Sequence, residues 1–156
     1  MKNKVDLLCL QRIYSWKKEG WFVPLSTSLE GISPSDAAWQ PAPGENTIWQ
    51  LVNHLNYWND LMLSNLQGNP RESKLSNDHT FGQPGDPKEV TDWEATVERS
   101  RRIELSIHKT LNSLDDNDLE ELSLSDEVAQ WIMHDSYHIG QIVLIRKLQG
   151  SWPANR

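Results

Sequence analysis

Cysteine is almost absent from this chain of 156 residues, which carries Cys9 alone. One thiol excludes a disulfide within the chain and a cysteine-rich zinc module, so we expect Cys9 to be a small, buried apolar residue. Long apolar runs are also missing, since none approaches the roughly 18 residues that span a bilayer. The start, Met1 to Lys4, leads into a mixed polar stretch and not into the apolar run of a secretion signal. We therefore expect a cytoplasmic protein that does not bind a membrane.

Basic residues are outnumbered, because Lys and Arg total 15 against 22 Asp and Glu, which leaves a net charge of -7 at pH 7. Nonspecific binding to nucleic acid depends on clustered cations that neutralise phosphates. The dense basic cluster of the chain, Arg99, Arg101 and Arg102, has acidic neighbours. This balance predicts that nucleic acid is not a partner.

Phenylalanine and tyrosine are scarce, with 2 and 3 copies, but tryptophan occurs 8 times. Each Trp buries a large apolar area, so a hydrophobic fraction of 37% can still fill a core and leave aromatic side chains for a ligand pocket. A folded chain of this length buries about 68–70% of the surface that its unfolded form exposes. We expect residues 1–156 to form a single domain.

Strand signals are weak, because no stretch alternates polar and apolar residues for long. Apolar residues instead recur at steps of three and four, which is the spacing of one helix face. Polar stretches that carry proline and glycine separate these segments. The pattern predicts an all-α fold, a four-helix bundle. The expected helices cover about 5–29, 47–67, 91–114 and 125–149.

Capping residues mark the starts of two of these helices. Thr47 with Gln50 matches a capping box at the start of the second helix, and Thr91 with Glu94 matches one at the start of the third. In each pair the two side chains satisfy backbone amides that a helix start leaves free.

The segments between the helices differ in character. Pro24 is expected to kink the first helix, because it lacks a backbone donor. Residues 31–45 are expected to be an ordered loop, and residues 115–121 a short acidic connection. The polar loop 69–87 is longer than most connections in compact domains, which indicates a role at the mouth of a site.

Three of the five histidines fall where the interior of the bundle is expected. His134 and His138 are four residues apart on the last helix, so their side chains share one face and can chelate one ion. His54 lies beside the apolar stripe of the second helix. Three neutral imidazoles without an evident fourth protein ligand suit a divalent transition metal with an open position. The plainer interpretation is that these histidines are hydrogen-bonded core residues.

Other titratable residues carry weaker signals. Glu104 and His108 are four residues apart and are interpreted as a solvated pair. Asp135 lies about 100° around the helix from His134 and is expected to point elsewhere. His79, in the long loop, is a candidate for the mouth of a site. The chain lacks the His-Glu-x-x-His and Glu-x-x-His metal motifs and the phosphate, dinucleotide and nucleophile-elbow motifs.

Three segments resemble motifs of the DinB/YfiT-like superfamily. Residues 46–55 resemble its second-helix motif, in which a polar cap and apolar residues lead to a metal-binding histidine. Residues 134–142 resemble its C-terminal His-x-x-x-His-x-Gly-Gln signature, and Trp39-Gln40-Pro41 resembles the Trp-x-Pro that often precedes the second helix. The resemblance covers nearly the whole chain in order and spacing.

This resemblance implies up-down-down-up connectivity and a homodimer. It implies a divalent ion, nickel or zinc with iron or manganese as alternatives, held by His54, His134 and His138. Proteins of this family include thiol-dependent S-transferases and isomerases that use a low-molecular-weight thiol such as bacillithiol, mycothiol or glutathione. Ile139 departs from the commonest signature, in which Arg follows the second histidine, and this removes a cation beside the site.

Two classes of function stay open at the level of sequence. In the first, an ion lowers the pKa of a bound thiol or water, and the chain is an S-transferase or a hydrolase acting on a small-molecule substrate. In the second, the bundle is a non-enzymatic module that holds a metal, a ligand or a partner. The lack of an evident general acid or base beside the histidines favours this second class. Asn53, Tyr57 and Gln141 lie near the histidines along the helices and are candidates to orient them.

Overall fold

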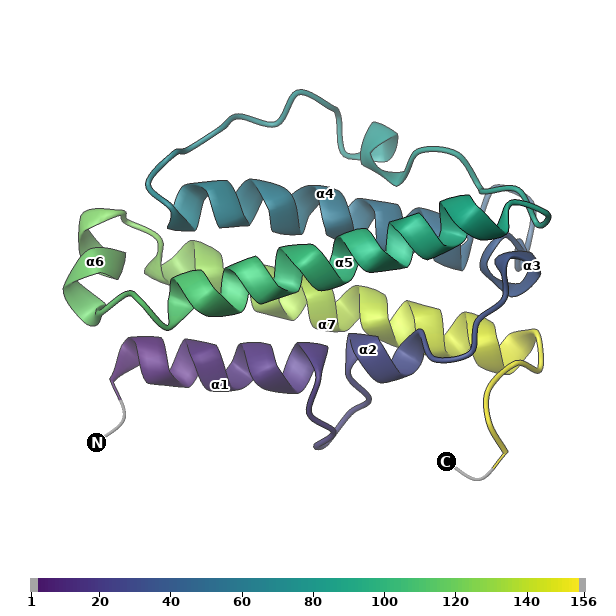
Figure 1. Cartoon of the computed structure of the whole chain (residues 1–156), viewed down its shortest axis with the longest axis horizontal. Coiled ribbons are helices and arrows are strands. Elements are labelled where there is room, and N and C mark those ends of the chain that lie inside the picture. The colour runs from purple at the N-terminus through teal and green to yellow at the C-terminus, as the bar shows by residue number, and fades with distance from the viewer. Residues whose placement is uncertain (1–2, 155–156) are drawn as a thin grey trace.

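Helices account for all the regular secondary structure of residues 3–154, which the computed structural model describes (Figure 1). Four of these helices are long and pack side by side as a bundle, so the all-α four-helix fold predicted from the periodicity is confirmed. Among residues 3–154, none of the helices combines the length and the hydropathy that a membrane span requires. The long helices are α1 (Lys4–Trp16), α4 (Ile48–Leu66), α5 (Val90–Leu111) and α7 (Ser125–Leu148).

The long helices run up, down, down and up, as the family resemblance implies (Figure 1). The neighbours α4 and α5 are therefore parallel. Because α4 has 19 residues and is about 28 Å long, the chain must return along that length before α5 can begin. This geometry explains the long loop 67–89, which arches over α4 and contains the short 3-10 helix η1 (Asp78–Phe81).

The first helix is shorter than its sequence pattern predicts. α1 ends at Trp16, and helical backbone returns only in the single turn of α2 (Leu25–Ser28). Pro24 precedes that turn in an extended conformation, with φ -72° and ψ 162°. Proline has no amide hydrogen and disfavours helical backbone at the residue before it. The prediction of one kinked helix is therefore wrong. Residues 17–24 are not helical, and Pro24 lies at the N-cap of a second helix and does not bend the first.

Short helices, α3 (Pro34–Ala37) and α6 (Asp116–Glu121), occupy two segments predicted to be connections. The carboxylate of Asp115 caps α6 by accepting from two backbone amides of its first turn. Asp116 accepts hydrogen bonds from the first two amides of α1, at 3.1 and 2.9 Å. The acidic run is therefore more than the predicted connection. It forms a helix of its own, and it accepts hydrogen bonds from backbone amides at the start of α1.

The capping box predicted for α4 is present, and the one predicted for α5 is not. Thr47 Oγ1 accepts from the amide of Gln50 at 3.1 Å, and Gln50 Oε1 accepts from the amide of Thr47 at 3.0 Å. α5 begins at Val90, so Thr91 already lies inside the helix and does not cap it. The residue at the cap position is Glu89, whose side chain makes no capping hydrogen bond.

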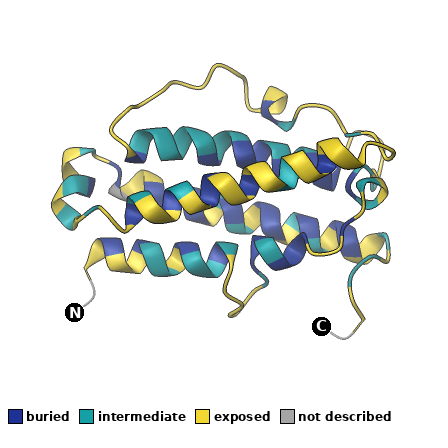
Figure 2. Ribbon diagram, viewed as in Figure 1, coloured by how far each residue is buried: buried dark blue, intermediate teal, exposed yellow. Residues whose placement is uncertain are grey.

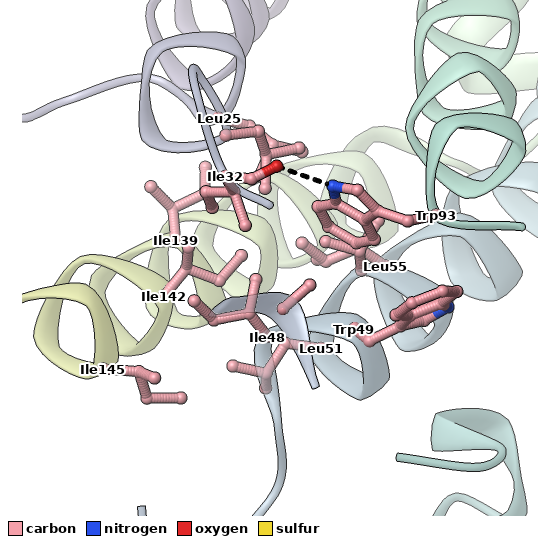
Figure 3. Close-up of a cluster of buried hydrophobic side chains, with 13 residues drawn as sticks. Leu25, Ile32, Ile48, Trp49, Leu51, Leu55, Trp93, Ile139, Ile142 and Ile145 are labelled. Carbon is pink, nitrogen blue, oxygen red and sulfur yellow. Dashed lines mark hydrogen bonds between the residues drawn. The ribbon is translucent and has the colours of Figure 1, made fainter. Parts of the chain in front are cut away.

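Two clusters of buried apolar side chains fill the two ends of the bundle, and Figure 2 shows such buried residues along the facing sides of the long helices. The first cluster joins α2 and α3 to the start of α4 and the end of α7 (Figure 3). In it the indole N–H of Trp93 donates to the carbonyl oxygen of Ile32 at 2.9 Å. The second cluster joins α1 and α6 to the end of α4 and the start of α7. Cys9 packs against the second cluster and is partly buried.

A layer of buried polar side chains separates the two apolar clusters. Arg12, on α1, is 2% exposed and contacts the three other long helices. Its guanidinium donates to Asn59 Oδ1 at 2.8 Å, to Glu104 Oε2 at 2.7 Å and to Asp135 Oδ2. The ring of Trp131 lies 4.5 Å from the guanidinium carbon. A buried charge is costly unless it is paired. The four long helices must therefore pack in the register that brings these partners to Arg12.

Glu104 does not form the solvated pair that its spacing from His108 predicts. Glu104 is 6% exposed and pairs with Arg12, whereas the ring of His108 lies at the surface. Burial raises the pKa of Glu104, and the neighbouring Arg12 opposes this rise. The prediction was wrong because Glu104 lies between Ile103 and Ile107 on the buried face of α5, where a cation from another helix reaches it.

Replacement of Arg12 tests the role of the polar layer. Arg12→Ala is expected to lower the free energy of unfolding by about 3–5 kcal/mol, because it leaves two carboxylates buried without their cation. Urea denaturation of the two proteins measures the loss. Lys4→Ala breaks the exposed ion pair with Glu120 and is the matched control, which should leave the urea midpoint nearly unchanged. Equal effects of the two substitutions would contradict the central role of Arg12.

Candidate metal centre

Three imidazole rings from α4 and α7 meet beside the polar layer. His54 Nε2 lies 3.0 Å from His134 Nε2, and His134 Nε2 lies 3.1 Å from His138 Nε2. One ring nitrogen from each residue lies within 4.8 Å of the other two. His134 and His138 are one turn apart on α7, and α4 packs against that helix. The structure thus brings together the three histidines that were singled out in the sequence.

The cluster is closed around two of its rings and open beside the third. His54 and His138 are 2% and 7% exposed, whereas the side chain of His134 is 32% exposed. Phe81, from η1, stacks on His54 with ring centroids 4.0 Å apart and planes inclined by 9°. A small molecule can therefore approach the cluster from the side of His134.

The outer nitrogens of two rings face oxygen atoms that can only accept hydrogen bonds. His138 Nδ1 lies 2.6 Å from Gln141 Oε1, and His134 Nδ1 lies 3.5 Å from Asp135 Oδ1. An amide oxygen and an ionised carboxylate have no proton to give. The contact with Gln141 therefore keeps the ring proton of His138 on Nδ1, and the nearby carboxylate of Asp135 favours the same tautomer of His134. The Nε2 atoms of these two rings are consequently left with free lone pairs.

His54 reaches the same protonation state through Thr80. His54 Nδ1 lies 2.5 Å from Thr80 Oγ1. The single hydroxyl proton of Thr80 is donated to the carbonyl oxygen of Asn77. Thr80 Oγ1 must therefore accept the proton of His54 Nδ1, which leaves His54 Nε2 with a free lone pair.

The three Nε2 atoms fit a divalent transition-metal ion. Three lone pairs cannot hydrogen-bond to one another, so their approach is repulsive without a cation between them. Metal–nitrogen bonds of about 2.0–2.1 Å place two ligands roughly 2.8–3.4 Å apart, for angles between 90° and tetrahedral. The separations of His134 Nε2 from the Nε2 atoms of His54 and His138, 3.0 and 3.1 Å, lie in that range, and the three ligand atoms lie within 4.8 Å of one another. No fourth Asp, Glu, His or Cys of residues 3–154 joins the group, so a bound ion would keep an open position.

Burial favours the neutral form of the two enclosed rings, His54 and His138. It lowers the pKa of His54 to about 3, with further contributions from His138 and His134. Burial also lowers the pKa of His138. An imidazole binds a metal only in its neutral form, so His54 and His138 are in the state that binding requires near neutral pH.

A known protein family accounts for most of the chain. The family model of the DinB superfamily matches residues 25–142. The chain belongs to the DinB superfamily. No curated protein and no solved structure matched it. The matched segment includes all three histidines of the cluster, whereas α1, which carries Arg12, precedes it.

Asp135 lies closer to the histidines of this DinB-superfamily chain than its helical angle predicts. Its carboxylate binds Arg12 through Oδ2 and lies 3.5 Å from His134 Nδ1 through Oδ1. Burial by itself would raise the pKa of Asp135, but Arg12 holds the pKa below its usual value. The prediction that Asp135 points elsewhere is wrong, because the ring of His134 turns its Nδ1 edge toward the neighbouring carboxylate.

The loop 67–89 supplies two site residues that no sequence motif identified. Thr80 and Phe81 contact His54, and the unusual length of the loop was the one available signal of their role. His79 lies next to them in the chain but outside the cluster. Its ring is exposed and its Nδ1 lies 2.6 Å from Ser76 Oγ.

Of the three polar residues predicted to orient the histidines, Gln141 contacts a ring directly. Asn53 Nδ2 donates instead to the carbonyl oxygen of Phe81, at 3.5 Å. The hydroxyl of Tyr57 accepts from two loop amides at 3.0 and 3.3 Å. Asn53 and Tyr57 therefore act on the loop that covers the cluster.

Thr80→Val tests the contact between the loop and His54. Valine has nearly the shape of threonine but no oxygen, so His54 Nδ1 loses its acceptor. Loss of such an outer contact is expected to raise the Kd for zinc about 10–100-fold, measured by competition with a fluorescent chelator. Thr110→Val on α5 is the matched control and should leave the Kd unchanged. An unchanged Kd in Thr80→Val would show that the contact does not orient the ring.

The depressed pKa of His54 predicts a pH-dependent stability of the metal-free protein. His54 is neutral in the folded state and gains a proton in the unfolded state below about pH 6.5. Stability is therefore expected to fall as the pH drops from 6.5 to 5, by about 2 kcal/mol from this group. Urea denaturation at several pH values in the presence of a chelator measures the fall.

Two variants identify the source of this pH dependence. His54→Gln should reduce the fall between pH 6.5 and 5, because it removes the group that titrates. His79→Gln, at an exposed position, should leave the fall as it is. The same pH dependence in parent and His54→Gln proteins would contradict the assignment.

Proposed function

We propose that this chain is a divalent-metal-dependent enzyme that transfers a low-molecular-weight thiol to small electrophilic molecules. His54, His134 and His138 would hold the ion, with nickel or zinc as the expected metal. One observation carries the proposal: three Nε2 atoms lie close together, and the cluster is open to solvent beside one of the three rings, His134. An open position on a bound ion is where substrate or a nucleophile binds in catalytic sites.

A bound ion supplies Lewis acidity, which lowers the pKa of a thiol so that its thiolate is available near neutral pH. Neighbouring residues of the chain orient the imidazole rings that would hold the ion. Gln141, Asp135 and Thr80 keep the ring protons on Nδ1, which sets the tautomer and the orientation of each imidazole. Arg12 in turn holds Asp135 in place.

In the proposed reaction the thiolate sulfur attacks an electrophilic carbon of the substrate. A sulfur–carbon bond forms while the bond to the leaving group breaks, and the leaving group departs with the electron pair. The thiol proton passes to solvent on the exposed side of His134. No group is oxidised or reduced, so the reaction needs no further reactant.

The carboxylates near the histidines favour thiol transfer over hydrolysis. A hydrolase benefits from a free base that takes a proton from water. Asp135, the carboxylate in contact with the cluster, is 2% exposed and already binds Arg12 and Asn59. A thiol has an ordinary pKa of about 8.5 and loses its proton far more readily than water, so it has less need of such a base.

Metal content tests the site itself. Purified untagged protein is expected to contain about one nickel or zinc ion per chain, and His134→Ala/His138→Ala is expected to contain none. His108→Ala removes an exposed histidine of α5 and should keep the metal. Elemental analysis measures all three. Absence of metal from the parent, even after incubation with several divalent ions, would overturn the proposal.

Turnover tests the reaction. The metal-loaded protein is mixed with 1-chloro-2,4-dinitrobenzene and with glutathione, mycothiol or bacillithiol in turn, and the thioether is followed by its absorbance. With at least one thiol the parent is expected to react about 100-fold faster than His134→Ala/His138→Ala, since a bound metal is worth several kcal/mol to such a step. A metal-loaded parent without thiol-dependent turnover would favour the non-enzymatic module instead.

A further inference from the structure

A pocket of about 490 Å³ lies between α4 and α7 beside His134. Trp58, Leu61 and Met62 line it from α4, and Trp131 lines it from α7, one turn before His134. The pocket therefore reaches the exposed ring of the histidine cluster from the end of the bundle where α4 terminates. Its volume lies in the range of small-molecule sites.

We propose that this pocket binds the neutral aromatic part of the electrophilic substrate and directs its reactive carbon toward His134. That the occupant is the substrate follows from the proposed function. The preference for a neutral aromatic molecule rests on the side chains of the pocket, which provide aromatic walls and no cation.

Two indole rings form the aromatic walls. Trp131 is 5% exposed, and its ring is held against the guanidinium of Arg12. Trp58 approaches His54 edge-on, with ring centroids 6.3 Å apart. The indole nitrogens of Trp58 and Trp131 are buried and have no hydrogen-bond partner among the described residues. Because these nitrogens are not accessible, an occupant of the pocket meets the carbon atoms of the two rings. Rigid indole faces bind flat aromatic rings by stacking and by burial of apolar area.

The charges around the pocket disfavour an anionic occupant. The described residues of its lining include no Lys or Arg, and Glu127 is the one carboxylate among them. Ile139, where the commonest family signature has Arg, is 2% exposed in the first apolar cluster and adds no cation. Arg12 is buried and already paired with two carboxylates. Besides Glu127 and His134, the polar residues of the lining are amides that suit a nitro or carbonyl group, namely Asn65, Asn77 and Gln130.

A larger pocket of about 710 Å³ lies against α1 on another face of α7. Tyr14, Trp21 and Met133 line it, and no histidine of the cluster does. It is a second place where an apolar probe can bind, so the test must tell the two pockets apart. The indole of Trp21 reports binding there, whereas Trp58 and Trp131 report binding beside His134.

Indole N–H resonances provide this distinction. Protein freed of metal by a chelator is titrated with nitrobenzene, and the signals of its 8 tryptophans are followed by ¹H–¹⁵N correlation NMR after assignment with Trp→Phe variants. The signals of Trp58 and Trp131 are expected to shift and to saturate. 4-Nitrobenzoate adds only a carboxylate to the same ring and is expected to bind at least about tenfold more weakly, because its charge would be buried without a partner.

A variant that fills the pocket completes the test. Leu61→Trp is expected to abolish the shifts of Trp58 and Trp131. Leu144→Trp, at a 56% exposed position of α7, is the matched control and should preserve them. Shifts confined to Trp21, or equal affinity for the two probes, would overturn the proposal.

The metal-free titration keeps this inference separate from the proposed function. Shifts of the two indoles without any thiol transfer would support the pocket and overturn the thiol-transfer function alone. In an active enzyme, Leu61→Trp is expected to raise KM for 1-chloro-2,4-dinitrobenzene about tenfold or more at unchanged metal content. An unchanged KM would overturn the assignment of the pocket to the substrate.

Discussion

The guanidinium of Arg12 is the contact on which both the packing of the helices and the histidine cluster depend. It lies between two apolar clusters and is neutralised by Glu104 on α5 and Asp135 on α7, with Asn59 on α4 as a further acceptor. Buried ions are tolerated only when they are paired and hydrogen-bonded, so the four helices must meet in the register that supplies these partners. Since Asp135 also contacts His134, the network that aligns the helices orients one ring of the cluster as well.

The parallel arrangement of α4 and α5 imposes a second constraint, because the chain has to travel back along α4 between them. The returning loop is held against the bundle near its end, where Gly85 has φ +90° and lies so close to Trp49 that a Cβ atom would come within 2.3 Å of the ring. Along its path the loop places Thr80 and Phe81 against His54. The connection that the topology requires therefore also forms a wall of the candidate metal centre.

The helices could be predicted from the sequence to the extent that local signals decide them. Apolar stripes and the capping box at Thr47 depend on residues three or four positions apart, and they located four long helices. The interruption near Pro24 was predicted as a kink and not as a break over residues 17–24. The helix α6 was missed, and it depends partly on a distant element, because its Asp116 accepts from the amides of α1. The homodimer, the cytoplasmic location and the identity of the ion stay predictions.

The sequence by itself determined that His134 and His138 share one helix face, because a spacing of four residues is a property of the helix alone. The place of His54 beside an apolar stripe made it a candidate, the motif resemblance supported it, and the structure brought its ring to the other two. Only the tertiary structure decided that Arg12 and Thr80 belong to the same assembly. Arg12 is 123 residues from Asp135 in the chain, and Thr80 is 26 residues from His54. No periodicity relates positions so far apart, and their contacts exist only because the helices pack in one register and the loop returns over α4.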